Sequence, residues 1–146
     1  MAITPYLYYE DLPGAVKWLE KAFGFKTFGP TMRRDGKLTH AAMKRGDAVV
    51  MMGYPGPKYR NPRHLKRATQ SLYVMAKGVD KTFARARKAG AKVLEEPMNT
   101  EYGHRRCGVE DPEGHQWYFA EEIKKASSRG HRAPGRRAVD QQRSAP

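Results

Sequence analysis

Histidine and cysteine are the side chains in this sequence best suited to metal binding or nucleophilic chemistry. Four of the five histidines lie in the first 123 residues, at His40, His64, His104 and His115. Their spacing contains neither His-x-His nor His-x-x-x-His, the patterns that place two imidazoles on one face of a strand or helix. The single cysteine, Cys107, has no disulfide partner, and no nucleophile is paired with an evident base. The spacing therefore predicts neither a histidine metal site nor a nucleophilic enzyme.

The positive charge is unevenly distributed along the chain. The net charge is +13; residues 124–146 contribute +6 (seven Lys/Arg minus one Asp) and residues 1–123 contribute +7 (21 minus 14). Because residues 124–146 hold few apolar side chains, we expect a disordered basic tail there. Such a tail makes nucleic-acid binding the second alternative function. We expect no membrane span and no signal peptide, and hence a cytoplasmic location.

The first 123 residues contain an internal repeat. An apolar strand pattern at residues 3–9 leads through Asp11-Leu12-Pro13-Gly14 into a helical stretch at residues 15–23, and residues 72–88 repeat this order. Three strand candidates follow each helix, at residues 26–30, 39–44 and 48–52, and again at residues 92–95, 105–109 and 116–120. The sequence therefore predicts one α+β domain over residues 1–123. Its βαβββ modules would span about residues 1–53 and 71–123, joined by a connector at residues 54–70.

Several short phrases within this repeat carry a family resemblance. Thr4-Pro5-Tyr6-Leu7-Tyr8, Lys21-Ala22-Phe23-Gly24 and the turn from Asp111 to Trp117 resemble the vicinal oxygen chelate superfamily of glyoxalases, bleomycin-resistance proteins and extradiol dioxygenases. Tyr102-Gly103-His104-Arg105 is similar to its PhnB-like branch. The resemblance implies curled mixed sheets around a cavity, with the helices outside. It also implies a homodimer whose modules pair either within or between chains.

Metal-dependent members of this superfamily hold a divalent ion with four His, Gln or Glu side chains. These come from the first and last strand of each module, and the matching positions here are Thr4, Met51, Ser71 and Tyr118. None of these side chains is a strong ligand for zinc, nickel, manganese or iron, so no cofactor is predicted. Lyase, isomerase, transferase or dioxygenase chemistry is then the first alternative function. Whether the chain is an enzyme is left open; if it is, Tyr118 or His104 would be the general acid or base.

The resemblance and the alternation along strands together predict a ligand cavity. Side chains two residues apart on a strand share a face, which groups Tyr6 with Tyr8 and Ser71 with Tyr73. Aromatic rings and hydroxyls suit a planar ligand, and Arg105 suits an anion; the alternative is that the tyrosines fill the core. The predicted ligand-binding residues are Thr4, Tyr6, Tyr8, Met51, Ser71, Tyr73, His104, Arg105 and Tyr118. The leading function is binding of a small aromatic or anionic organic molecule without a metal, resembling sequestration by bleomycin-resistance proteins.

Overall fold

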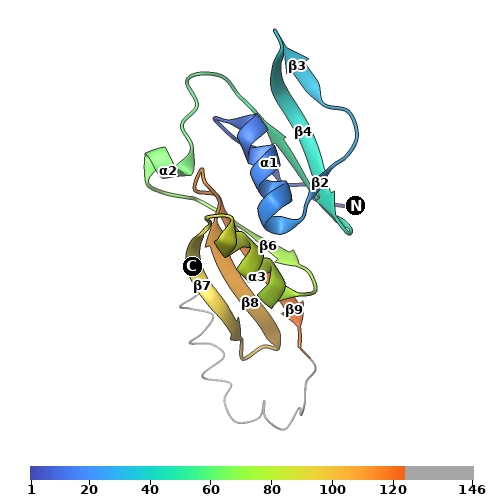
Figure 1. The fold of residues 1–146 in the computed structure, drawn as a ribbon, viewed down its shortest axis with the longest axis vertical. Helices are drawn as coiled ribbons and strands as arrows, with labels where there is room; N and C mark the ends of the chain where they lie inside the picture. Colours follow the sequence, from blue (N-terminus) through green and yellow to red (C-terminus); the bar gives the residue numbers. More distant parts are fainter. Residues whose placement is uncertain (124–146) are drawn as a thin grey trace.

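Each half of the chain folds into a strand, a helix and a set of further strands. The computed structural model describes residues 1–123, so the tail predicted for residues 124–146 lies outside the described residues. The first half consists of β1 (Tyr6–Tyr8), α1 (Leu12–Phe23), β2 (Lys26–Thr27), β3 (Met32–Arg34), β4 (Lys37–Arg45) and β5 (Ala48–Gly53). The second half consists of β6 (Ser71–Met75), α3 (Val79–Lys88), β7 (Lys92–Asn99), β8 (His104–Glu110) and β9 (Gln116–Glu122) (Figure 1). A short helix, α2 (Pro62–Leu65), lies in the connector. The predicted α+β fold of two βαβββ modules is confirmed.

The two sheets have the same topology. Their strand orders are β1-β5-β4-β2, with β3 also paired to β4, and β6-β9-β8-β7. In each sheet the first strand pairs in parallel with the last, and the remaining pairs are antiparallel. Tyr6 lies opposite Met51, and Tyr73 lies opposite Tyr118. Both pairs are related by the same offset of 67 residues (73 − 6 and 118 − 51), so the repeat extends to the register of the strands.

Local capping sets the ends of the two long helices. Asp11 caps α1 by accepting a hydrogen bond from the backbone N–H of Gly14 at 3.0 Å, and Gly24 ends the helix in a left-handed conformation. Helix α3 follows Gly78, which has no side chain to act as a cap. Glu121 of β9 instead accepts the backbone N–H of Val79 at 3.0 Å. Among the described residues, no helix has the length and apolarity needed to cross a membrane.

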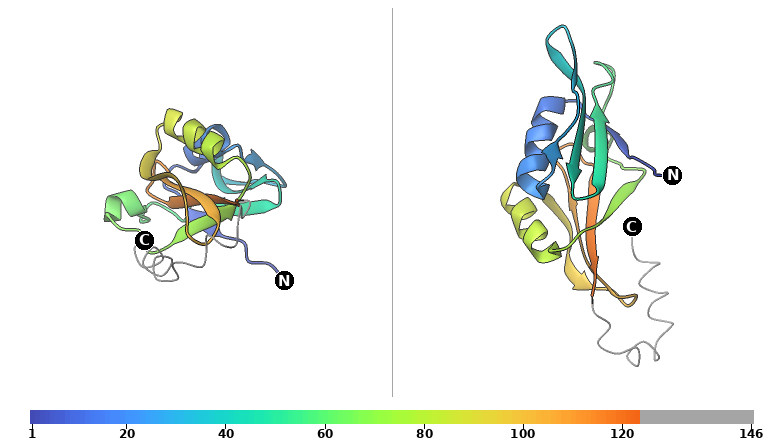
Figure 2. Two further views of the ribbon diagram at one scale, coloured as in Figure 1. Left: turned by 90° about the horizontal axis from the view of Figure 1, so that it is seen from below. Right: turned by 90° about the vertical axis from the view of Figure 1, so that its right-hand side faces the viewer.

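Helices α1 and α3 lie side by side on the same face of both sheets (Figure 2). Trp18 of α1 donates its indole N–H to the carbonyl of Ala89, just beyond α3, at 2.9 Å. Phe23 of α1 packs against Trp117 and Phe119 of β9, with ring centroids 5.0 and 4.7 Å apart. Burial of side chains of this size contributes about 1.5–3 kcal/mol each. The two modules therefore share one core, centred between the helices and the sheets.

The turn between β8 and β9 ties the modules together through a buried carboxylate. Asp111 is only 1% exposed and accepts four hydrogen bonds. Its Oδ2 accepts the hydroxyl of Tyr9 at 2.7 Å and the indole N–H of Trp117 at 3.1 Å. Its Oδ1 accepts the backbone N–H groups of Glu113 and His115, each at 3.0 Å. One side chain thus fixes both the shape of the turn and the end of β1.

Glu113 in the same turn holds the connector. Its carboxylate accepts the backbone N–H groups of Glu10 and Asp11 at 2.6 and 2.8 Å, and the side-chain amide of Asn61 at 3.1 Å. Glu10 in turn accepts the backbone N–H of Asn61 at 2.8 Å and contacts Nδ1 of His64 at 2.6 Å. The start of α1, the connector and the β8–β9 turn are therefore joined in one hydrogen-bonded network.

Candidate functional site

The face of both sheets opposite α1 and α3, here called the open face, carries most of the predicted ligand-binding side chains. Tyr6 and Tyr8 of β1 are 45% and 49% exposed, and Tyr73 and Met75 of β6 are 45% and 47% exposed. Leu7, between the two β1 tyrosines, is buried in the core, as strand alternation requires. Tyr6, Tyr8 and Tyr73 therefore line a surface and do not fill the core.

Within residues 1–123, the open face is a surface that is not closed over by a second layer of the chain. The two sheets lie side by side, with both helices on one side of them (Figure 2). The connector contacts one end of the open face, where the hydroxyl of Tyr59 donates to the carbonyl of Tyr8 at 3.0 Å and the two rings meet edge to face. Because Tyr73 and Met75 remain about half exposed, a ligand can reach the face directly.

Tyr118 forms the floor of the open face in the second module. Its ring lies directly over Gly108 of β8, so closely that a Cβ atom at position 108 would overlap the Cε2 atom of the ring. In the first module Gly53 of β5, which is not the repeat counterpart of Gly108, lies close to Tyr6: a Cβ atom at position 53 would lie 2.7 Å from the Tyr6 hydroxyl. Burial raises the pKa of the Tyr118 phenol, with a further contribution from the charge of Glu95. Each sheet thus has a tyrosine side chain in close contact with a glycine.

Each module also pairs a tyrosine with a histidine on the open face. The hydroxyl of Tyr6 lies 2.8 Å from Nδ1 of His40, and the hydroxyl of Tyr73 lies 2.8 Å from Nδ1 of His104. Burial, with help from the hydrogen bond to Tyr102, raises the pKa of Tyr73 to about 12. The Tyr73 phenol therefore keeps its proton at neutral pH and can donate it to a neutral imidazole.

Arg106 lies in the polar part of the open face, but neighbouring side chains already occupy its guanidinium, so it is not available to bind an anion. It is 6% exposed and donates from Nε and Nη2 to the two oxygens of Glu95, at 2.7 and 2.9 Å. Its Nη1 donates to the hydroxyl of Tyr102 at 2.7 Å, and that hydroxyl lies 3.4 Å from the hydroxyl of Tyr73. The hydrogen bonds to Glu95 raise the pKa of the guanidinium further. Arg106 therefore neutralises Glu95 and orients Tyr102.

The placement of Arg105 corrects the sequence prediction. Arg105 lies opposite Glu121, on the side of β8 that faces the helices, and its Nε donates to Oδ1 of Asp80 in α3 at 3.2 Å. Its Nη1 donates to Asn99 at 3.1 Å. Arg106, one residue later, is the arginine on the open face. The alternation of buried Cys107 and Val109 with His104 and Arg106 was the signal that could have identified it.

The four positions predicted to surround a metal in related proteins lie on or beside the open face. Thr4 precedes β1 and is exposed, Met51 lies opposite Tyr6, Ser71 is exposed, and Tyr118 lies opposite Tyr73. Their oxygen and sulfur atoms belong to hydroxyls, a phenol and a thioether, which do not fit the donor set that a divalent ion prefers. Within residues 1–123, no group of three or more His, Cys, Asp or Glu side chains is arranged to hold a metal ion.

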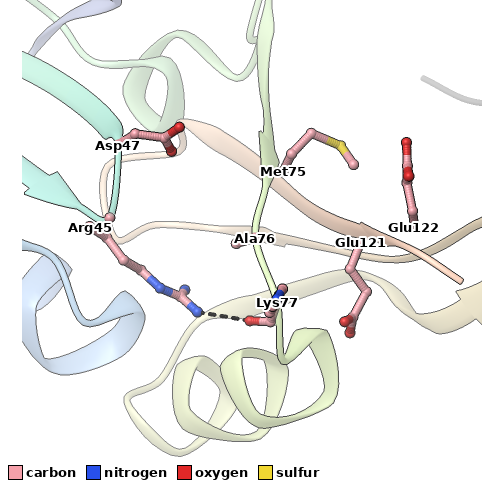
Figure 3. A pocket seen from close by; sticks show the side chains of 8 residues that line it. Arg45, Asp47, Met75, Ala76, Lys77, Glu121 and Glu122 are labelled. Carbon is pink, nitrogen blue, oxygen red and sulfur yellow. Dashed lines mark hydrogen bonds between the residues drawn. The ribbon is translucent and has the colours of Figure 1, made fainter.

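A pocket of about 510 Å³ lies at the end of the open face where β6 and β9 finish (Figure 3). The turn from Arg45 to Asp47 forms one wall, and Met75, Lys77 and Glu121 contribute to the others. The guanidinium of Arg45 donates to the carbonyl of Lys77 at 3.2 Å. Glu121 already accepts the first N–H of α3. Arg45 therefore joins the two modules at this pocket, and Glu121 caps α3 within the second module.

Comparison with known proteins identifies the family. The family described as the glyoxalase/bleomycin resistance protein/dioxygenase superfamily matches residues 3–119. The chain belongs to this superfamily. The uncharacterized protein Mb0911c of Mycobacterium bovis is 30% identical over 131 residues, covering 86% of each chain. Placement in the PhnB-like branch stays a prediction.

Two solved structures share the fold of this chain. TioX from Micromonospora sp. ML1 superposes with a TM-score of 0.69 at 28% identity, covering 84% of this chain and 99% of that chain. The fosfomycin resistance protein FosX from Listeria monocytogenes, solved with Mn(II) and dihydroxypropylphosphonic acid, has a TM-score of 0.60 at 11% identity. That match covers 85% of this chain and 92% of that chain. At 11% identity, the match to FosX shows a shared fold and nothing more.

Proposed function

We propose that this protein binds a small planar organic molecule on the open face. The observation that carries the proposal is the set of aromatic side chains from both modules, including Tyr6, Tyr8 and Tyr73, that lie half exposed on one surface. Aromatic side chains offer large contact areas with little loss of conformational entropy, and their hydroxyls can orient a ligand. An exposed group of this kind is characteristic of a surface that another molecule covers.

The polar network of the second module sets the character of the proposed ligand. Tyr73, His104 and Tyr102 present hydroxyl and imidazole groups within hydrogen-bonding distance of one another. The charges of Arg106 and Glu95 cancel in a bidentate pair. This part of the face therefore favours an uncharged ring system with hydrogen-bonding edges, held by stacking and by neutral hydrogen bonds.

Binding without a metal is part of the proposal. The hydroxyl, phenol and thioether groups at Thr4, Met51, Ser71 and Tyr118 support it, because a divalent ion would have to be held without a carboxylate or an imidazole at these positions. Sequestration of the ligand, as in bleomycin-resistance proteins, is the activity that this arrangement favours.

Proton transfer without a metal is a second candidate, and one contact favours it. The hydroxyl of Tyr73 lies 2.8 Å from Nδ1 of His104 on the open face, so Tyr73 could take a proton from a bound substrate while it passes its own proton to the imidazole. In that case replacement of His104 by Gln would abolish turnover while preserving binding.

We also propose that the protein forms a homodimer. The support is the apolar surface that one chain leaves exposed, including Met75 at one end of the open face and Ile3, which is 94% exposed. Sedimentation equilibrium would test it directly: a single species with the mass of one chain at micromolar concentration would rule the dimer out.

Fluorescence titration with phenylnaphthylamine, an uncharged aromatic probe, tests the main proposal. We expect saturable binding that is unaffected by a chelator or by added nickel, zinc or manganese. Tyr73→Ala should weaken binding about tenfold, or ~1.4 kcal/mol, because the exposed ring loses its contact with the probe. Leu65→Ala is a matched control, since Leu65 is 56% exposed but lies on α2, outside both sheets.

The outcomes of the titration separate the candidates. Equal affinity of the wild-type protein, Tyr73→Ala and Leu65→Ala would refute binding at the open face. Binding that requires a stoichiometric metal ion would refute the metal-free proposal and restore the metal-dependent reactions of the family.

A further inference from the structure

A second pocket, here called the connector pocket, lies where the connector crosses the second sheet. It has a volume of about 500 Å³ and is lined by four basic side chains, Arg63, Lys66, Arg67 and Lys92, and by one acidic side chain, Glu110. Three chain segments contribute these residues: the connector, the start of β7 and the end of β8. The pocket therefore concentrates positive charge in a concave site, not along an extended surface.

Among residues 1–123, only one of the four basic side chains has an acidic neighbour within ion-pair distance. Arg63 lies 3.4 Å from Glu110 and also donates to the carbonyl of Asp111 at 3.2 Å. Within residues 1–123, no carboxylate lies within ion-pair distance of Lys66, Arg67 or Lys92. Three positive charges thus face the same hollow without a counterion from the described part of the chain.

The connector pocket opens at one end of the tyrosine surface. Gln116 lines the pocket and precedes Tyr118 by two residues on β9, so both side chains emerge on the open face, about 7 Å apart along the strand. Gln116 lies opposite Ser71, and Tyr118 lies opposite Tyr73. Tyr118 is only 4% exposed, so a molecule of ordinary ligand size would lie against the exposed ring of Tyr73 beside it and could reach the pocket at the same time.

The basic side chains are presented by a fixed backbone. Gly114 packs against the connector so closely that a Cβ atom there would lie 2.6 Å from the backbone nitrogen of Arg63. The N–H of Arg63 donates to the carbonyl of Glu113 at 3.0 Å, and the N–H of Arg67 donates to the carbonyl of Pro62 at 3.1 Å. A preorganised arrangement of this kind loses little entropy when it binds a ligand.

We infer that the connector pocket binds the anionic group of the same molecule whose rings lie on the open face. The inference rests on the proposed function and adds a ligand class: a planar aromatic compound that carries a carboxylate, sulfonate or phosphate. Lys66, Arg67 and Lys92 take the role that the sequence assigned to Arg105. Nucleic acid is the competing anion, but a single hollow of this size at the end of an aromatic surface suits one charged group better than a row of phosphates.

Two probes with the same ring system test this inference on the full chain. Anilinonaphthalene sulfonate carries a negative charge, and phenylnaphthylamine is its uncharged counterpart. For Arg67→Gln/Lys92→Gln, we expect the affinity for the sulfonate to fall about tenfold at low salt, because partly exposed charges each contribute a few-fold. The affinity for the uncharged probe should not change. Lys81→Gln/Arg87→Gln removes the same charge from the exposed side of α3 and should change neither affinity.

The results distinguish failure of the inference from failure of the proposed function. If the double variant in the pocket binds the sulfonate as the wild type does, or if the wild type does not bind it, the anion site is refuted, while binding of the uncharged probe can still support the open face. If Tyr73→Ala changes the affinity for neither probe, the proposed function itself fails. If Arg67→Gln/Lys92→Gln loses affinity for a single-stranded oligonucleotide but not for the sulfonate, the pocket is part of a nucleic-acid surface and the inference is overturned.

Discussion

Replacement of Asp111 should strongly destabilise the fold. The carboxylate is almost fully buried and accepts four hydrogen bonds, from Tyr9, from Trp117 and from two backbone N–H groups. Asp111→Ala leaves these four donors without an acceptor in the interior. At about 1–1.5 kcal/mol for each lost bond, the free energy of unfolding should fall by about 4–6 kcal/mol. This is a large part of the ~5–15 kcal/mol that stabilises a typical domain.

Smaller changes at the same site keep the test informative if Asp111→Ala does not fold. Asp111→Asn retains one acceptor oxygen but turns an amide N–H₂ toward two of the donors, so a loss of about 2–3 kcal/mol is expected. Tyr9→Phe removes one donor and should lose about 1–2 kcal/mol. Asp47→Asn is the control, because Asp47 is exposed in the turn between β4 and β5 and should change stability by less than ~0.5 kcal/mol.

Urea unfolding, followed by far-ultraviolet circular dichroism, measures these differences. The expected order of stability is wild type and Asp47→Asn, then Tyr9→Phe, then Asp111→Asn, then Asp111→Ala. If the free energy of unfolding of Asp111→Ala lay within about 1 kcal/mol of the wild-type value, the role assigned to the buried carboxylate would be refuted, because the expected loss is much larger.

Three further predictions concern the site and its surroundings. Gly108→Ala should displace the Tyr118 ring, which lowers stability by about 1–3 kcal/mol and weakens phenylnaphthylamine binding; unchanged affinity in a titration would contradict this contact. The hydrogen bond from the Asn61 backbone lowers the pKa of Glu10. The ionised Glu10 carboxylate should therefore contribute to stability above its unfolded pKa of about 4.3, and this contribution should be lost as the pH falls through the lower folded pKa. In acid unfolding, Glu10→Gln should make the free energy of unfolding depend less on pH in that range. Removal of residues 124–146 should leave the affinity for phenylnaphthylamine unchanged, since the open face lies within residues 1–123; a tenfold loss would place part of the site beyond them.

The sequence predicted the fold and much of the open face because both depend on simple periodicities. Alternation along β1 and β6 places Tyr6, Tyr8 and Tyr73 on one face, whatever the details of packing. Because of the repeat of 67 residues, matching side chains lie on the same face of the sheet in both modules. Periodicity could not predict whether one chain closes a cavity, since that depends on how the two sheets are placed relative to each other.

The alternation along β8 could have separated Arg105 from Arg106, but the partners of Arg106 depend on strand register. The hairpin between β7 and β8 closes through a hydrogen bond from the N–H of Thr100 to the carbonyl of His104 at 2.7 Å, and this turn sets which side of β8 each residue faces. An irregularity in β7 between Val93 and Glu95 then brings Glu95 opposite Gly108, within reach of Arg106. Irregularities of this kind have no clear sequence signature.

The contribution of the connector was also hidden in the sequence. Residues 54–70 were predicted only as a link between modules, yet Asn61 caps α2 by accepting the N–H of His64 at 2.9 Å, and the segment packs onto Gly114. The Asn61-Pro62 pair is a typical start of a helix and was the available signal. This pair of residues does not indicate the surface against which the helix packs.

Backbone amide NMR spectra recorded during titration with phenylnaphthylamine would test the central claim most directly. If the open face is the binding site, the largest shifts will occur at Tyr73, Gly108 and Tyr118, while Lys81 and Arg87 on the far side of α3 stay unchanged. Shifts confined to the helix side of the sheets, with none at Tyr73 or Tyr118, would contradict the proposal that this protein binds its ligand on the open face.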